Sequence, residues 1–197
     1  MPIINMQQLA RIVKQSYKHE IIIGYAMDGI VIHNGMLTVW FDDTTAPKKL
    51  KAIIAEAIGK IPAPGSGLSS YSEFHENEPY VCEMETVDRI CGILLDKMEA
   101  DVALKETPVR LGAHVLLQEP ETSKTISLDM TLAALLDKTK IDYNIEGDPT
   151  GPACSYTSPI VYWSTQTCTL AIHPSTLSEH PLEIARYLET LKLYKED

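Results

Sequence analysis

Two groups of residues carry side chains that could perform chemistry, and neither has the spacing of a known catalytic motif. Segment 61–80 contains serines, His75 and glutamates, which are the residue types of a nucleophile and its base. Its GSGLSS run, however, differs from the G-x-S-x-G turn that presents a serine nucleophile. His75, Cys82 and Cys91 could bind zinc, but their spacing matches no common ligand pattern. The sequence therefore predicts a non-enzymatic protein with no catalytic residue, metal site or cofactor.

Charge is distributed unevenly along the chain. The formal net charge of −10 opposes indiscriminate nucleic-acid binding by the whole surface, but it leaves room for one local basic face. The stretch 62–85 holds five glutamates and no Lys or Arg. Basic residues gather instead in two segments with helical spacing, 5–17 and 44–59. They are either phosphate contacts or an ordinary solvated helix face.

Length and composition are those of a globular protein. A chain of 197 residues can bury roughly 70% of its unfolded surface, so it needs neither a disulfide nor a metal to fold. The four cysteines form no CxxC pair and are expected to be small core residues in a reducing compartment. No apolar run approaches the length of a membrane span, and residues 1–15 show no signal-peptide pattern. We expect a cytoplasmic protein that does not bind membranes.

Local patterns predict the elements of the first half. Asn5 caps a helix that ends near Tyr17, with Met6, Leu9, Ile12 and Val13 as its apolar stripe. Residues 20–42 predict hairpins, with Asp28-Gly29 and Asn34-Gly35 as turn dipeptides. Thr44 or Thr45 caps a second helix that ends at Gly59. An irregular loop over 61–80 and a long helix over 85–104 follow.

The second half predicts a strand at 109–118, a helix at 127–138 capped by Ser127, and three strands at 140–147, 158–164 and 167–174. A final helix spans 181–195. The fold class is therefore α+β, with one or more antiparallel sheets and helices packed on one face. We expect a single domain over 1–197, whose two halves, about 1–60 and 109–174, are joined by the loop and long helix of 61–104.

Part of this pattern resembles a known family. The run ISLDMTLAALLDKTKIDYNIEG, then SPIVYWST and CTLAIHP, resembles the closing βαβββ unit of a DNA sliding clamp. The segment IIIGYAMDGIVIHNGMLTVWFD is similar to the first hairpin of such a clamp, and the resemblance points to clamp-like proteins of phages and mobile elements as relatives. The chain differs from the clamp family in two respects. A full clamp subunit has two or three copies of the domain where this chain has room for about one, and a helix follows Pro174.

The resemblance implies a DNA-associated, clamp-like accessory protein that forms homo-oligomers. Clamps turn helices toward a central DNA channel, where basic side chains neutralise phosphates without reading bases. The residues expected to contact double-stranded DNA are Arg11, Lys14, Lys18, Lys48, Lys51 and Lys138.

A protein-binding function is the alternative hypothesis. The acidic stretch would imitate the phosphates of DNA and occupy the basic groove of a partner protein, for example a host defence nuclease. An anti-defence inhibitor of this kind would use Glu73, Glu76, Glu78, Glu83 and Glu85.

Overall fold

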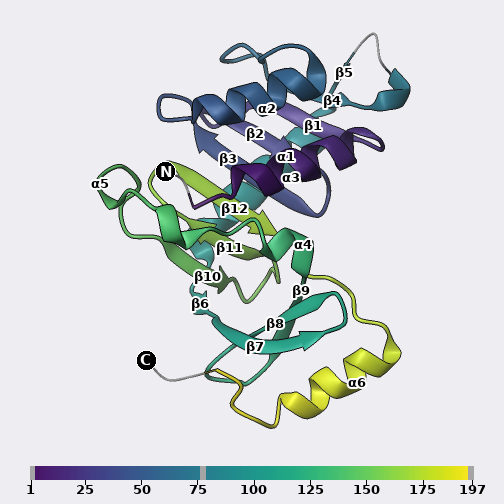
Figure 1. Cartoon of the computed structure of the whole chain (residues 1–197), viewed down its shortest axis with the longest axis vertical. Coiled ribbons are helices and arrows are strands. Elements are labelled where there is room, and N and C mark those ends of the chain that lie inside the picture. Colours follow the sequence, from purple (N-terminus) through teal and green to yellow (C-terminus); the bar gives the residue numbers. More distant parts are fainter. Residues whose placement is uncertain (1–2, 76–78, 195–197) are drawn as a thin grey trace.

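The computed structural model describes residues 3–75 and 79–194. Within them the chain forms a nine-stranded sheet with strand order β5-β4-β1-β2-β3-β12-β11-β10-β6 and a three-stranded sheet with order β7-β8-β9 (Figure 1). Every strand pair in both sheets is antiparallel. The predicted α+β class with antiparallel sheets is confirmed.

The helices are α1 (Met6–Tyr17), α2 (Lys48–Ile58), α3 (Met84–Asp96), α4 (Met130–Ala133), α5 (Tyr143–Glu146) and α6 (Glu179–Leu188), with 3-10 turns η1 (Glu73–His75), η2 (Lys97–Glu99) and η3 (Lys138–Lys140). The large sheet contains β1 (Ile21–Ala26), β2 (Gly29–His33), β3 (Leu37–Asp42), β4 (Leu68–Tyr71), β5 (Tyr80–Val81), β6 (Val102–Ala103), β10 (Thr150–Cys154), β11 (Val161–Ser164) and β12 (Cys168–Ile172). The small sheet contains β7 (Lys105–Leu111), β8 (His114–Gln118) and β9 (Thr125–Asp129).

The two halves of the chain are joined into one sheet where β3 pairs with β12. The register runs from Leu37 opposite Ile172 to Phe41 opposite Cys168. Side chains of both strands that point to the same face as Val39 are almost completely buried. This seam makes the first and last parts of the chain neighbours in space.

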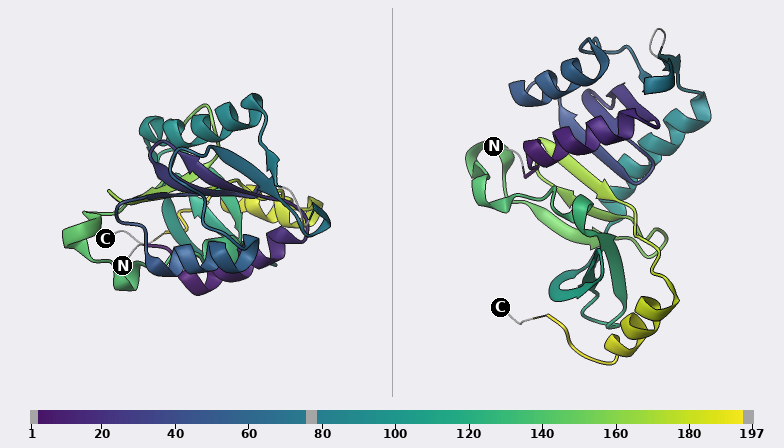
Figure 2. Two further views of the ribbon diagram at one scale, coloured as in Figure 1. Left: turned by 90° about the horizontal axis from the view of Figure 1, so that it is seen from above. Right: turned by 45° about the vertical axis from the view of Figure 1, so that its right-hand side comes forward.

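Helices cover both faces of the large sheet. The buried stripes of α1 and α2 pack on one face, in a cluster that continues across the seam to Val161 and Trp163. Helix α3 lies on the opposite face, where Ile90 and Leu94 contact Val31 (Figure 2, left). The prediction placed the helices on one face. Helix α3 packs on the other face because its buried residues Ile90 and Leu94 contact the side chains there.

Most of the local predictions for residues 5–59 are confirmed. Helix α1 has the predicted bounds, and Asn5 Oδ1 accepts hydrogen bonds from the backbone N–H groups of Gln7 and Gln8, both at 3.1 Å. The hairpins of β1, β2 and β3 form as predicted. Helix α2 ends at Gly59, which adopts a left-handed φ of 74°. Its N-cap is Pro47, however, rather than either of the predicted threonines, whose hydroxyls bond to Asp42 instead.

Three predictions in the middle of the chain were wrong. The loop expected over 61–80 contains β4, which pairs with β1. The helix expected over 85–104 ends at Asp96, and the chain then enters β6. The single strand expected over 109–118 is a hairpin of β7 and β8, since Gly112, with φ of 60°, turns the chain.

The second half also differs from its predicted helix and strand. Ser127 lies inside β9 opposite Leu116 rather than capping a helix. The cap is Asp129, and the helix after it, α4, lasts one turn. Segment 140–147 holds η3 and α5 instead of a strand, because the Asp142 side chain accepts a hydrogen bond from the N–H of Asn144 and starts a helical turn.

The C-terminal segment packs on the small sheet. Helix α6 is shorter than the predicted 181–195 and ends at Leu188. After it, the buried Gln118 amide donates to the carbonyl of Leu191 at 2.8 Å and accepts from the N–H of Leu193 at 2.8 Å. Glu189 accepts hydrogen bonds from Thr125. These bonds fix the end of the described chain against β8 and β9.

A histidine is buried on the α3 face of the sheet. His33 is 3% exposed, and its Nδ1 lies 2.8 Å from Thr38 Oγ1. Burial, together with the nearby Arg89 and His173, lowers the pKa of His33 from 6.5 to about 4, and burial is the largest of these causes. Burial also lowers the pKa of His173. Both imidazoles are therefore neutral in the folded protein at neutral pH.

We expect the free energy of unfolding to decrease between about pH 7 and pH 4.5. Because the pKa of His33 is lower in the folded state than the 6.5 of the unfolded chain, the unfolded state takes up the proton first. The stabilisation is complete above pH 6.5 and is lost as the pH falls through about 4. The loss from this side chain is about 2 kcal/mol. Urea titrations across this range measure it, and His33→Gln should show a smaller loss. An equal loss in the variant would contradict the assignment to His33.

The continuous sheet predicts that both halves unfold together. The two tryptophans report on opposite sides of the seam, since Trp40 lies on β3 and Trp163 on β11. In each of the single-tryptophan variants Trp40→Phe and Trp163→Phe, the fluorescence and far-UV circular dichroism midpoints in urea should coincide. Fluorescence midpoints that depart from the circular dichroism midpoints in opposite directions would show that the halves unfold separately.

Candidate nucleic-acid interface

Helices α1 and α2 lie side by side over the first part of the large sheet (Figure 2). Their apolar stripes are buried beneath them, so the polar sides of both helices face outward together. A groove of about 360 Å³ runs between them, with Arg11, Lys14 and Glu56 among the residues that line it. Its floor includes Tyr17 and Ile53. We call the outward side of these two helices the α1/α2 surface.

Positive charge is concentrated on this surface. Segments 5–19 and 44–60, which contain the two helices, hold seven of the 17 Lys and Arg residues of the chain. They hold one of its 27 Asp and Glu residues, Glu56. The remaining residues are therefore strongly acidic. The net charge of −10 is the sum of two basic segments and an acidic remainder.

The start of α2 carries charges that do not suit the helix itself. Lys48 is its first residue, Lys49 follows, and the first turn has no acidic side chain. The partial positive charge of a helix N-terminus disfavours cations there by a few tenths of a kcal/mol. Pro47 provides no side-chain cap to offset this. Lysines at this position do not stabilise the helix.

The structure brings five of the six predicted DNA contacts onto the two helices or their ends. Arg11, Lys14 and Lys18 are exposed on α1 and just after it, and Lys48 is exposed on α2. Lys51 already has an anionic partner in the protein, because its Nζ lies 3.3 Å from Asp43 Oδ1. The four other cations have no ion pair within residues 3–75 and 79–194.

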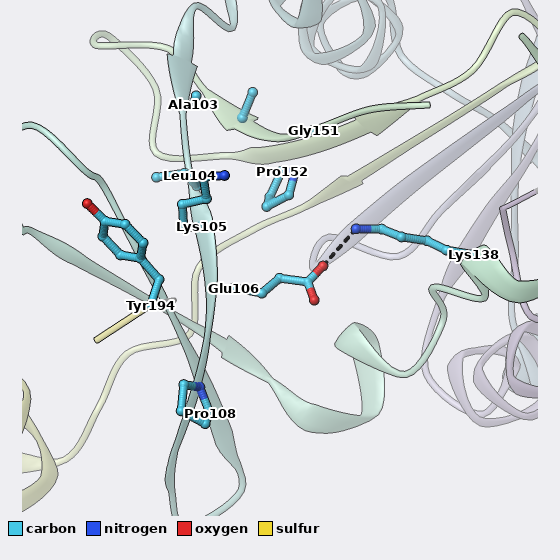
Figure 3. A pocket seen from close by; sticks show the side chains of 10 residues that line it. Ala103, Leu104, Lys105, Glu106, Pro108, Lys138, Gly151, Pro152 and Tyr194 are labelled. Atoms are coloured by element: carbon cyan, nitrogen blue, oxygen red, sulfur yellow. Dashed lines mark hydrogen bonds and ion pairs between the residues drawn. The ribbon is translucent and has the colours of Figure 1, made fainter. Parts of the chain in front are cut away.

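Lys138, the sixth predicted contact, lies apart from the α1/α2 surface. It belongs to η3, and its Nζ forms an ion pair of 2.8 Å with Glu106 Oε1 (Figure 3). Both side chains line a cavity of about 630 Å³ beside Pro152 and Tyr194. Glu106 partly neutralises Lys138 and would compete with a phosphate for it, so this residue is the weakest member of the predicted set.

Sequence reasoning left out two cations and one aromatic residue of this region. Lys49 is exposed beside Lys48, and Lys60 lies at the far end of α2 with its Nζ 5.9 Å from the centroid of the Tyr71 ring. Tyr17 lines the groove between the helices. The density of lysines in 48–60 was visible in the sequence, whereas the position of Tyr17 depends on the packing of α1 against α2.

The acidic residues of the alternative hypothesis gather at another place. Glu73 lies in η1, Glu83 precedes α3 and Glu85 is in its first turn, and all three are exposed. Glu76 and Glu78 lie outside the described residues. The described members surround β5, at the end of the sheet.

Two kinds of feature are absent from the described residues, a metal-binding cluster and a membrane-spanning helix. The described chain contains no group of three or more His, Cys, Asp or Glu residues that could hold a metal ion. None of its described helices is both long and apolar enough to cross a bilayer.

The cysteines do not form a reactive site. Cys154 and Cys168 are buried and Cys82 and Cys91 partly buried, and burial raises the pKa of all four thiols. Raised pKa values leave the thiols protonated and poorly nucleophilic at neutral pH.

Comparisons of the chain with protein-family models, with curated proteins and with solved structures gave no match.

Proposed function

We propose that this protein associates with double-stranded DNA, without sequence preference, through the α1/α2 surface. The observation that carries the proposal is the charge segregation, in which seven of 17 basic residues and one of 27 acidic residues lie in the two segments that form this surface. A protein with a net charge of −10 is repelled by DNA over most of its surface. The local basic surface would therefore set both the affinity and the orientation of the complex.

The dimensions of the surface suit a DNA backbone. A helix of the length of α1, 12 residues, extends about 18 Å. The phosphates of each strand wind around the duplex axis, so the cations of α1 and those at the start of α2 would meet different phosphates. Five exposed cations, Arg11, Lys14, Lys18, Lys48 and Lys49, are available for such contacts.

The chemistry of the surface favours contacts to phosphates over contacts to bases. Its cations are mainly lysines, which act as point charges on flexible stems, and only Arg11 offers a planar fork for bidentate recognition. Two helices lying flat on a sheet also present a broad surface rather than one projecting helix that could enter a major groove. Both features support positioning on the backbone rather than base readout.

A clamp-like accessory role in phages or mobile elements is the wider form of this proposal. Its support is the placement of α1 and α2 together on one face of an antiparallel sheet, which is where the resemblance to sliding clamps puts DNA-facing helices. Two other elements implied by that resemblance, the leucine-rich helix and the strand after it, are absent from 127–147. Association into a homo-oligomer and the lack of enzymatic activity remain predictions.

We expect the protein to bind fluorescently labelled duplex DNA with an affinity that falls steeply with salt. Five phosphate contacts give a slope of about −4.5 in a plot of log K against log salt concentration. In the double variant Lys14→Glu, Lys48→Glu the slope should shrink to about −2.7 and the affinity at low salt should fall at least tenfold. Fluorescence anisotropy measures both quantities. Lys51 stays unchanged because it pairs with Asp43.

The matched control changes the same amount of charge elsewhere. Arg110 and Lys124 are exposed on the small sheet and its turn, so Arg110→Glu, Lys124→Glu alters the net charge equally without touching either helix. This control should keep most of the affinity. An equal loss in both double variants, or no binding at low salt, would overturn the proposed interface.

A further inference from the structure

The open end of the large sheet, strand β5, has unused backbone hydrogen-bonding groups. In the described chain β5 has one strand neighbour, β4, opposite Ser69 and Ser70. Cys82 donates its N–H to Leu68 of that neighbour at 3.1 Å. Because successive residues of a strand point their N–H and C=O groups in opposite directions, those of Val81 point away from β4. This donor and acceptor are directed outward, where another strand could pair with them.

The side chains at this edge are apolar and exposed. Tyr80 is 58% exposed, Val81 84% and Met84, at the start of α3, 72%. An edge strand with exposed apolar side chains is a template for pairing with another chain. Tyr80 and Val81 are successive strand residues, so their side chains point to opposite faces of the sheet at this edge. We call Tyr80, Val81 and Met84 the β5 edge.

The charges around the β5 edge decide what kind of chain fits it. Glu83 follows Val81 by two residues and lies with Glu20 beside Tyr80 and Val81, and the stretch 62–85 contains no Lys or Arg. Pairing with the β5 edge of a second copy would bring these carboxylates together, which is unfavourable. A strand that carries lysines or arginines would neutralise them, so charge complementarity favours a cationic partner over self-association.

A cleft beside the β5 edge could receive one side chain of that partner. It has a volume of about 460 Å³ and lies next to Tyr80, Val81 and Cys82. Glu20 and Glu83 line it, against a single cation, Arg89. When a strand is added to a sheet edge, the backbone bonds supply affinity and such pockets supply specificity.

We propose that the β5 edge binds an extended, cationic segment of a partner protein by adding it as a tenth strand to the large sheet. This surface is separate from the α1/α2 surface and does not depend on DNA binding. The partner segment alternates apolar side chains, which lie on the face of Val81, with basic side chains, which meet Glu20 and Glu83 in the cleft next to Tyr80. Glu76 and Glu78, which lie outside the described residues, play no part in the argument.

The test uses a defined probe, a capped peptide about eight residues long that alternates Lys and Val, the length of an ordinary strand. Its binding to the full chain is measured by isothermal titration calorimetry at low and moderate salt. Two control peptides separate the contributions. One replaces every Lys by Glu, and the other keeps the sequence but has an N-methyl group on every backbone amide, so that neither of its edges can pair with a strand.

The matched protein variants are Val81→Pro and Val81→Thr. Proline removes the outward N–H while the bonds to β4 stay in place, and threonine keeps both the N–H and the β-branched shape. The Lys–Val peptide should bind the wild-type and Val81→Thr proteins alike and bind Val81→Pro at least about fivefold more weakly, as expected for loss of one backbone hydrogen bond. Neither control peptide should bind. DNA affinity should be the same in all three proteins.

Three results would overturn the proposal. Equal binding of the Lys–Val peptide to Val81→Pro would exclude strand addition at β5. Equal binding of the Glu–Val peptide would exclude charge complementarity. A wild-type dimer that dissociates in Val81→Pro, measured by sedimentation equilibrium, would identify a second copy of the chain as the occupant. Because DNA affinity is measured separately, these failures are distinct from failure of the DNA-binding proposal.

Discussion

The alternation of side chains across the nine-stranded sheet is the constraint on which the rest of the molecule depends. Side chains on one face, from Ile23 and Ile32 across to Leu170, are apolar and almost fully buried, and they require the cover that α1 and α2 give. The opposite face carries polar groups such as His33, Thr38 and Thr169 among its apolar ones. A single helix, α3, covers part of that face. One pattern thus determines where the large core lies and which helices form an outer layer.

The distribution of charge follows from this layering. Helices that cover the apolar face expose only their polar sides. The residue types on those sides therefore determine the charge of the whole outer surface. In α1 and α2 the exposed charged side chains are Arg11, Lys14, Lys48 and Lys49, with Glu56 as the single exposed carboxylate among the residues of these helices. The exposed start of α3, behind the sheet, bears Glu83 and Glu85 instead. The acidic and basic surfaces are held apart by the thickness of the sheet, which lets a strongly acidic protein keep an undisturbed basic surface.

How much could be predicted from the sequence depends on how local the deciding interaction is. Helix α1 was predicted with its correct bounds because the Asn5 cap and the apolar stripe both lie within it. Segment 140–147 was predicted as a strand because Ile141, Tyr143 and Ile145 alternate with other residues as in a strand. Instead, the Asp142 side chain accepts a hydrogen bond from the backbone and starts a helical turn. Strand β4 was missed because its sequence, Leu-Ser-Ser-Tyr, is short and half polar, and because it forms by pairing with the distant strand β1. Gly24 of β1 lets it approach so closely that a Cβ there would lie 2.1 Å from the carbonyl oxygen of Gly67.

The candidate site shows the same limit. The lysines of 48–60 were evident from composition, but their meeting with Arg11 and Lys14 required the packing of α2 beside α1, which no local pattern encodes. Lys138 was grouped with them on the strength of a resemblance, and an ion pair with Glu106, distant in sequence, holds it elsewhere. Similarly, the exposed groups of Val81 become visible only once β5 is known to end a sheet.

The β3–β12 seam also has a consequence for how the protein reaches its fold during synthesis. Strand β12 is made long after β3, so β3 waits on the ribosome with the backbone groups of one edge unpaired. Contacts between such distant residues form slowly, and an apolar edge exposed meanwhile favours aggregation. The nascent chain should therefore need a chaperone most between the emergence of β3 and that of β12. Ribosome-bound chains that end before residue 168 would be its natural clients.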